Sequence, residues 1–268
     1  MEREEKIIII DWGIFLHRSI FSWRKRKEIP PEYTCLSMVI GCLSKVGVEP
    51  YDKIIIAVDA RNSWRKDVEG EYKANRKEYR EKFDDIDWTD MYARFNILLE
   101  DLNKGTDWHI IKLDRLEADD VIAVGCRYYQ NKEVVIVSYD KDFEQLCIYP
   151  NVKIFSPLTK KYKIVEHPYK TLAQKIEKET SDNLVNPILT AEDYEKRKMI
   201  VSLIELPDFV EQSVKTELNK LGDKSGDLQY VPFETIRNRI GRLYNDKSKV
   251  VNYEKCLHSK KRKKRSKK

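Results

Sequence analysis

The sequence predicts an α/β fold with a mostly parallel central sheet flanked by helices, followed by a smaller helical region at the C-terminal end. Short β-branched runs such as Ile7–Ile10 and Val134–Val137 are typical of strands buried on both faces of a parallel sheet. Amphipathic stretches of helical period separate these runs. After Tyr169 the alternation stops and only helical patterns follow, so the sheet is expected to be complete by that point.

The order of the elements follows from where the apolar periodicity changes. Strands are expected at 7–10, 53–58, 108–113, 134–137 and 152–156, with a short hairpin partner at 160–164. Helices are expected at 15–23, 33–46, 88–102, 121–129, 143–147, 171–178, 191–206, 210–221 and 233–244, with a linker at 222–226. The chain is therefore expected to comprise an α/β domain at 1–168, a helical region at 169–258 and a disordered basic tail at 259–268.

Composition narrows the possible functions. With 268 residues, of which 41% are hydrophobic, the chain can bury one sizeable core. Its net charge is +6, but the tail 259–268 holds eight Lys or Arg residues and no acid, so the rest of the chain is slightly acidic. Such a mixture of acidic and basic patches suits a nucleic-acid enzyme with an acidic metal centre inside a basic rim, and it also suits any highly charged soluble protein.

Cysteine and histidine usage argues against a zinc protein. The five cysteines show no CxxC spacing and the four histidines are scattered. The sequence also has no apolar run of membrane-spanning length and no signal-peptide pattern. We therefore expect a soluble protein of a reducing compartment, located in the cytoplasm, without a membrane partner.

Acidic residues follow four of the expected strands. They are Asp11 after the first strand, Asp59 after the second, Glu117, Asp119 and Asp120 after the third, and Asp140 with Asp142 after the fourth. Parallel strands bring their carboxyl ends to the same edge of the sheet. Carboxylates gathered without His or Cys are typical ligands of Mg²⁺ or Mn²⁺.

A purely structural explanation of these acids also exists. Asp114 and Glu117 have the spacing of a capping box, and acids in a first helical turn are favoured by the helix dipole. Asp140 is likewise a good helix N-cap. The recurrence of acids at all four strand ends favours the metal site.

A basic, aromatic segment lies between the second strand and the helix at 88–102. Its cations and aromatic residues are Arg61, Trp64, Arg65, Lys66, Tyr72, Lys73, Arg76, Lys77, Tyr79, Arg80 and Lys82. Basic groups beside aromatic rings suit backbone phosphates and unstacked bases. The alternative is a solvated helix whose own glutamates pair with these cations, and charge alone does not decide between the two.

Five motifs resemble, in order and spacing, those of the 5′-nucleases, the superfamily of flap endonucleases and 5′→3′ exonucleases. They are Ile7–Asp11, Ala57–Asp59, Tyr72–Arg76, Glu117–Asp120 and Ser138–Asp142. Within that superfamily, Arg65–Asp67, Tyr149–Lys153 and Ser156-Pro157 with Lys160-Lys161 resemble the ribonuclease H of T-even bacteriophages. The resemblance covers residues 6–165.

This resemblance implies a PIN-like α/β domain that uses two ions of Mg²⁺ or Mn²⁺. The residues implied to hold the first ion are Asp11, Asp59, Glu117 and Asp119, with Asp140 nearby or bridging, and those implied for the second are Asp142 and Asp182. Lys73 and Arg76 are implied to clamp the scissile phosphate, and Asp120 to act mainly through water. Substrate contacts are expected from Arg61, Arg65, Tyr72, Lys77 and Arg80.

The chain departs from the family pattern downstream of the sheet. The family has a Gly-Asp-x-x-Asp-Asn motif that opens a duplex-binding helix-three-turn-helix module, whereas residues 178–183 keep Asp182-Asn183, place Glu179 at the earlier Asp and lack the Gly. The Gly-rich hairpin that follows in the family is absent as well. We therefore expect a reduced module, which puts the support of Asp182 in question.

The resemblance predicts a divalent-metal-dependent 5′-nuclease that cuts near the 5′ ends of branched or duplex nucleic acid. Its implied role is removal of RNA primers or flaps in replication, in the host cytoplasm if the protein is viral. Implied partners are DNA and RNA·DNA duplexes with 5′ ends or flaps, and replication proteins. Two alternatives remain: a catalytically weakened nucleic-acid-binding replication protein, and a PIN-type ribonuclease for single-stranded RNA, which does not predict the Tyr72–Arg76 motif.

Overall fold

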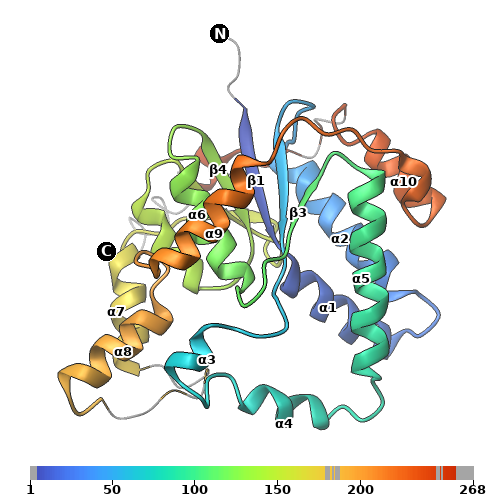
Figure 1. Ribbon diagram of the computed structural model, residues 1–268. Coiled ribbons are helices and arrows are strands. Elements are labelled where there is room, and N and C mark those ends of the chain that lie inside the picture. The colour runs from blue at the N-terminus through green and yellow to red at the C-terminus, as the bar shows by residue number, and fades with distance from the viewer. Residues whose placement is uncertain are drawn as a thin grey trace, which may run out of the picture.

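A six-stranded sheet forms the centre of the protein (Figure 1). The computed structural model describes residues 5–178, 182, 184, 188–245, 248 and 250–257. The strands are β1 (Lys6–Asp11), β2 (Lys53–Ala57), β3 (His109–Ile111), β4 (Glu133–Val137), β5 (Val152–Ser156) and β6 (Lys161–Lys163). They lie in the order β3-β2-β1-β4-β5-β6, and all pairs are parallel except β5 with β6. The expected α/β fold with a mostly parallel sheet is confirmed.

Helices cover both faces of this sheet. They are α1 (Trp12–Lys25), α2 (Pro31–Val46), α3 (Arg65–Val68), α4 (Asn75–Glu81), α5 (Trp88–Gly105), α6 (Ala118–Tyr128), α7 (Pro168–Lys178), α8 (Ala191–Val201), α9 (Asp208–Asn219) and α10 (Glu234–Gly241), with 3₁₀ helices η1 (Asp142–Ile148) and η2 (Leu228–Tyr230). The expected helix 191–206 was too long. It ends before Ser202, whose hydroxyl accepts hydrogen bonds from the N–H groups of Ile204 and Glu205 in a local turn.

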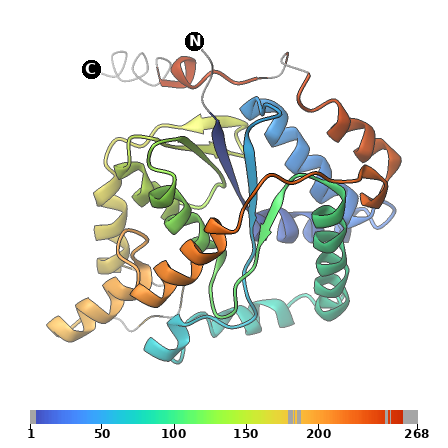
Figure 2. The ribbon, with the colours of Figure 1, turned by 45° about the horizontal axis from the view of Figure 1, so that its top comes forward.

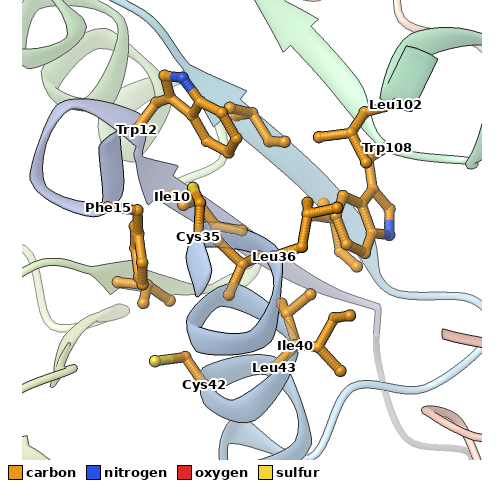
Figure 3. Close-up of a cluster of buried hydrophobic side chains, with 14 of the residues drawn as sticks. Ile10, Trp12, Phe15, Cys35, Leu36, Ile40, Cys42, Leu43, Leu102 and Trp108 are labelled. Atoms are coloured by element: carbon orange, nitrogen blue, oxygen red, sulfur yellow. The ribbon is translucent and has the colours of Figure 1, made fainter. Parts of the chain in front are cut away.

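The β-branched run of β1 explains why both faces are covered. Ile8 and Ile10 point into one core with α1, α2 and α5, and Ile7 and Ile9 point into a second core with α6 and α9. Figure 3 shows part of the first core, where aromatic and aliphatic side chains of several elements meet around Ile10. Burial of such side chains on both faces is the main force that holds the sheet together.

The C-terminal helices share these two cores. Val210 and Val214 of α9 belong to the core beneath α6, whereas Ile236 and Ile240 of α10 belong to the core of α2. Figure 2 shows α9 and α10 on opposite sides of the sheet. The change from strands to helices after residue 168 is therefore observed, but most of the helical region packs directly onto the α/β part. The tail 259–268 and most of residues 178–183 lie outside the described residues.

The topology assembles one functional edge. The direction of strand order reverses between β1 and β4, and ligands of open α/β sheets bind at the carboxyl ends of strands at such a point. The loops after β1, β2, β3 and β4 all leave from this edge. The connection 58–87, which contains α3 and α4, passes beneath the strand ends in Figure 1.

Candidate active site

Four carboxylates from four strand ends gather at this edge. Asp11 ends β1, Asp59 follows β2, Asp119 lies in the first turn of α6 after β3, and Asp140 follows β4. A Cβ atom at Gly13 would lie 3.4 Å from Oδ2 of Asp59 and 3.6 Å from Oδ1 of Asp11. Gly13 therefore keeps the space beside these two carboxylates open.

The carboxylates of this group influence one another. Burial raises the pKa of Asp11 to about 7, and Asp59 and Asp140 add to the rise, although the Ser138 hydroxyl donates a hydrogen bond of 2.8 Å to Asp11 Oδ2. Burial also raises the pKa of Asp119 well above its usual value, with added repulsion from Asp140 and Asp11 that Lys73 only partly offsets. Raised pKa values in a group of acids indicate negative charge that the protein itself does not neutralise.

The raised pKa of Asp11 gives a testable dependence of stability on pH. Between pH 4 and 7 the folded protein keeps a proton on Asp11 that the unfolded chain has lost, so its free energy of unfolding without metal should fall as pH rises. Asp11→Asn should flatten this slope and make the variant more stable than the wild type at pH 8, by on the order of 3 kcal/mol. Urea unfolding in EDTA at several pH values measures it.

Saturating Mg²⁺ is the internal control for this prediction, because ligation neutralises the carboxylate and should remove the advantage of Asp11→Asn. If the free energies of unfolding of the wild type and Asp11→Asn depended on pH in the same way in EDTA, the pKa of Asp11 would not be raised in the folded protein.

Glu117 differs from the group because cations surround it. Its carboxylate accepts hydrogen bonds from Lys73 Nζ at 2.9 Å, Tyr72 Oη at 3.0 Å and Arg65 Nη1 at 3.2 Å. Burial acts to raise the pKa of Glu117, but Lys73 and Arg65 outweigh it and hold the pKa below its usual range. The negative charge of Glu117 is therefore already balanced by Lys73 and Arg65, unlike the charges of the four-carboxylate group.

Asp120, expected to act mainly through water, lies inside the protein instead of at the open edge of the site. Its side chain is fully buried and accepts hydrogen bonds from Trp64 Nε1, from two nitrogens of Arg65 and from the N–H of Glu117. Together with Glu117 it forms the capping box of α6. Asp120 therefore fixes the start of the helix that carries Asp119.

Arg65 and Tyr72 also lie inside the protein, which corrects their expected contact with substrate. Arg65 is only 2% exposed, and its Nε donates to the Ile200 carbonyl at 2.8 Å while its other nitrogens bind Glu117 and Asp120. Tyr72 is 4% exposed, and its hydroxyl is engaged with Glu117. Trp64, which sequence reasoning did not assign to the site, stacks against the Arg65 guanidinium.

Lys73 and Arg76 lie beside acidic residues of the site. Lys73 has a φ of 58°, a strained conformation for a residue other than glycine, and its N–H donates to the Asp182 carbonyl at 2.8 Å. Its ammonium group points to Glu117. Arg76 is exposed and lies 3.7 Å from the Asp182 carboxylate. Both cations therefore adjoin the acidic edge.

Three further cations expected to bind substrate lie on the same connection. Arg61 and Lys77 are exposed, and Arg80 is partly exposed with its guanidinium 3.4 Å from the Tyr92 hydroxyl. Arg80 and Arg76 also act, after burial, to lower the pKa of His17 on α1 to about 4. A positive field therefore extends from α4 toward α1 and α5.

Asp142 and Asp182 both lie beside Lys175 of α7. The N–H of Asp142 donates to Asp140 Oδ1 at 2.9 Å, which links the pair to the four-carboxylate group. Lys175 of α7 forms ion pairs with both Asp142 and Asp182. Burial and Asp140 raise the pKa of Asp142 to about 6 despite Lys175.

The donor chemistry fits a hard divalent ion at the four-carboxylate group. Its side chains offer oxygen atoms, burial raises the pKa values of Asp11, Asp59 and Asp119, and Gly13 leaves room beside Asp11 and Asp59. Within the part of the chain that the structure describes, no three acidic, His or Cys side chains yet converge closely enough to form a complete metal site.

Comparisons with known proteins identify related sequences. The model of the 5′-3′ exonuclease N-terminal resolvase-like domain matches residues 6–180. The chain is 35% identical over 167 residues to the ribonuclease H of Enterobacteria phage T4, a match that covers 59% of this chain and 54% of that protein. The chain thus spans about half the length of this curated relative.

Solved structures show the same fold. Bacteriophage T5 5′-exonuclease with bound zinc has a TM-score of 0.60 at 17% identity, covering 81% of this chain and 100% of the other. A bacteriophage T5 flap endonuclease variant in a complex with DNA and metal ions has a TM-score of 0.52 at 18% identity, covering 91% and 90% of the two chains. Because the matched domain makes up more than half of the sequence, this chain belongs to the 5′-3′ exonuclease family.

Proposed function

We propose that the chain is a divalent-metal-dependent 5′-nuclease that hydrolyses phosphodiester bonds near the 5′ ends of branched or duplex nucleic acid. The observation that carries this proposal is the group of four carboxylates from four strand ends, unneutralised and bordered by Lys73 and Arg76. A protein that only bound nucleic acid would gain nothing from concentrated negative charge beside phosphates.

The residues divide into an acidic half and a basic half. Asp11, Asp59, Asp119 and Asp140 would hold Mg²⁺ or Mn²⁺, and Ser138 keeps Asp11 oriented through its hydrogen bond. Such an ion, when bound, supplies an acidic water and neutralises developing charge on the phosphate. A metal-bound structure of a T5 relative supports the use of divalent ions, and the family pattern implies a second ion near Asp142 and Asp182.

The basic half would position the phosphate. Lys73 and Arg76 lie across from the carboxylates, where their charges can bind the non-bridging oxygens and stabilise the transition state. Arg65, Glu117 and Asp120 act behind them by fixing α3 to α6. The strained backbone of Lys73 places its ammonium group without the freedom of an ordinary surface lysine.

Nucleic acid would lie along the exposed cations of the connection 58–87. Arg61, Lys77 and Arg80 can contact backbone phosphates, and the aromatic group of His17, Trp88 and Tyr92 lies beside Arg80. A T5 relative has been solved with DNA, which supports this assignment. The proposed substrates are DNA and RNA·DNA duplexes with 5′ ends or flaps, with replication proteins as further partners.

The proposed setting is primer or flap removal during replication in the cytoplasm of a phage-infected cell. The five cysteines are free thiols, which fits a reducing compartment, and the T4 relative is a phage protein. In the described part of the chain, no helix has both the length and the apolar character needed to cross a membrane.

One observation favours the second candidate, a nucleic-acid-binding replication protein with weakened catalysis. Lys175 forms ion pairs with Asp142 and Asp182, so a cation of the protein already lies at the second metal position. A PIN-type nuclease for single-stranded RNA shares the sheet and the acids, but it gives no reason for the Tyr72–Arg76 segment beside them.

The proposal is tested with a panel of 5′-labelled substrates: a flap, a blunt duplex, an RNA·DNA hybrid and a single strand, each with Mg²⁺, Mn²⁺ or EDTA. Short labelled fragments from the flap or the hybrid, formed only with metal, are expected. Preference for the single strand would favour the PIN-type ribonuclease. Binding of every substrate without cutting under any metal would favour the replication protein instead.

A further inference from the structure

Lys175 lies where a second ion would be expected. Its ammonium group forms an ion pair with Asp142 and lies 3.7 Å from the Asp182 carboxylate. These two residues come from different parts of the chain, Asp142 from the start of η1 and Asp182 from beyond α7. The side chains of Lys175, Asp142 and Asp182 are only 15 to 19% exposed, so water screens their attraction incompletely.

The helix that carries Lys175 is fixed on two sides. Thr171 Oγ1 of α7 donates to Glu144 of η1 at 3.0 Å, which joins the lysine's helix to the helix of Asp142. On the other side, Arg197 of α8 donates to the carbonyl of Ile176, whose side chain is buried. Lys175 therefore approaches Asp142 from a rigid helix.

The two halves of the acidic edge differ in their direct ion pairs. Among the described residues, Lys175 forms ion pairs with Asp142 and Asp182, and Arg76 lies 3.7 Å from the Asp182 carboxylate. Lys73 acts to lower the pKa of Asp119, and Lys73 and Arg76 act to lower that of Asp59, but within the described residues none of Asp11, Asp59, Asp119 and Asp140 forms a direct ion pair. A divalent ion is therefore favoured at the four-carboxylate group, and it is repelled by an ammonium group at the other position.

We propose that Lys175 is a built-in cation that takes the place of the second metal ion, so that this chain binds one divalent ion tightly instead of two. Its charge remains in the site at every metal concentration. This inference rests on the proposed function, because it concerns how the same site is charged.

Counting bound ions tests the proposal without an activity assay. Mn²⁺ is titrated into the full chain, and free ion is measured by electron paramagnetic resonance, with calorimetry as a second measure of stoichiometry. Wild type and Lys175→Arg are expected to bind one ion tightly, and Lys175→Met is expected to bind two. Lys170→Met, which removes an exposed lysine from the same helix, is the matched control and should behave like the wild type.

A double variant locates the additional ion. In Lys175→Met with Asp142→Asn, the ion gained by the first substitution should be lost again, whereas the first ion should remain. Circular dichroism confirms that each variant is folded. Two tightly bound ions in the wild type would overturn the proposal, and so would a folded Lys175→Met that still binds one.

The outcome is distinguishable from a failure of the proposed function. If the substrate panel shows metal-dependent cutting while the wild type binds two ions, the nuclease assignment stands and the role of Lys175 falls. If no substrate is cut, the nuclease assignment falls whatever the number of ions bound.

Discussion

Asp140→Asn is expected to lower the rate of cleavage by about 10³-fold or more while the protein remains folded. The substitution removes one negative charge from the four-carboxylate group that would hold the ion. The fold should persist because Asp140 is exposed and an asparagine oxygen can still accept the hydrogen bond from the Asp142 N–H. Single-turnover cleavage of a flap substrate with Mg²⁺ measures the loss.

Asp114→Asn is the matched control for Asp140→Asn. Asp114 is also an exposed acid, on the loop between β3 and α6, but it does not belong to the four-carboxylate group. Its rate should stay within a few-fold of the wild type. An Asp140→Asn protein that cuts within tenfold of the wild type would remove Asp140 from the proposed metal ligands.

Arg65→Met is expected to lower the free energy of unfolding by about 3 to 5 kcal/mol. The substitution introduces an apolar side chain of similar length, but it leaves the buried Asp120 without its cation and Glu117 with Lys73 alone. It also leaves the Ile200 carbonyl without its donor. Urea unfolding of the metal-free protein measures the change as a shift of the midpoint.

Two further variants separate the charge effect from general damage. Arg61→Met changes an exposed arginine and should alter the free energy of unfolding by less than about 0.5 kcal/mol. Adding Asp120→Asn to Arg65→Met should recover part of the loss, because the unpaired buried charge is then removed. Equal midpoints for wild type and Arg65→Met would show that the buried ion pair does not hold α3 to α6.

Much of the fold and the location of the site could be predicted from sequence, for reasons that act locally. Runs such as Ile7–Ile10 have no plausible state other than a strand buried on both faces. Once the strands are parallel, their carboxyl ends share an edge, and the acids that follow them must meet there. The positions of Asp11, Asp59, Asp119 and Asp140 follow from this rule.

The roles of the charged neighbours could not be predicted, because they depend on distant contacts. Arg65 and Arg61 look alike in the sequence. Arg65, however, is buried, and its Nε donates to the carbonyl of Ile200, which lies 135 positions away in the chain. Asp120 and Asp119 are adjacent, and the turn of α6 directs only Asp120 toward Arg65. The ion pairs of Lys175 could not be predicted either, because a lysine on an amphipathic helix is usually solvated.

The most direct test of the proposed metal-dependent nuclease is to add Mg²⁺ to a complex of the protein and nucleic acid that has already formed. The full chain is bound to a 5′-labelled flap or RNA·DNA hybrid in EDTA at low salt, and the reaction is started with Mg²⁺ in excess. The account predicts a stable complex with no cutting before Mg²⁺, followed by a burst of short 5′ fragments that Asp140→Asn abolishes without loss of binding. Cutting in EDTA, or a stable complex that stays intact after Mg²⁺ is added, would contradict it.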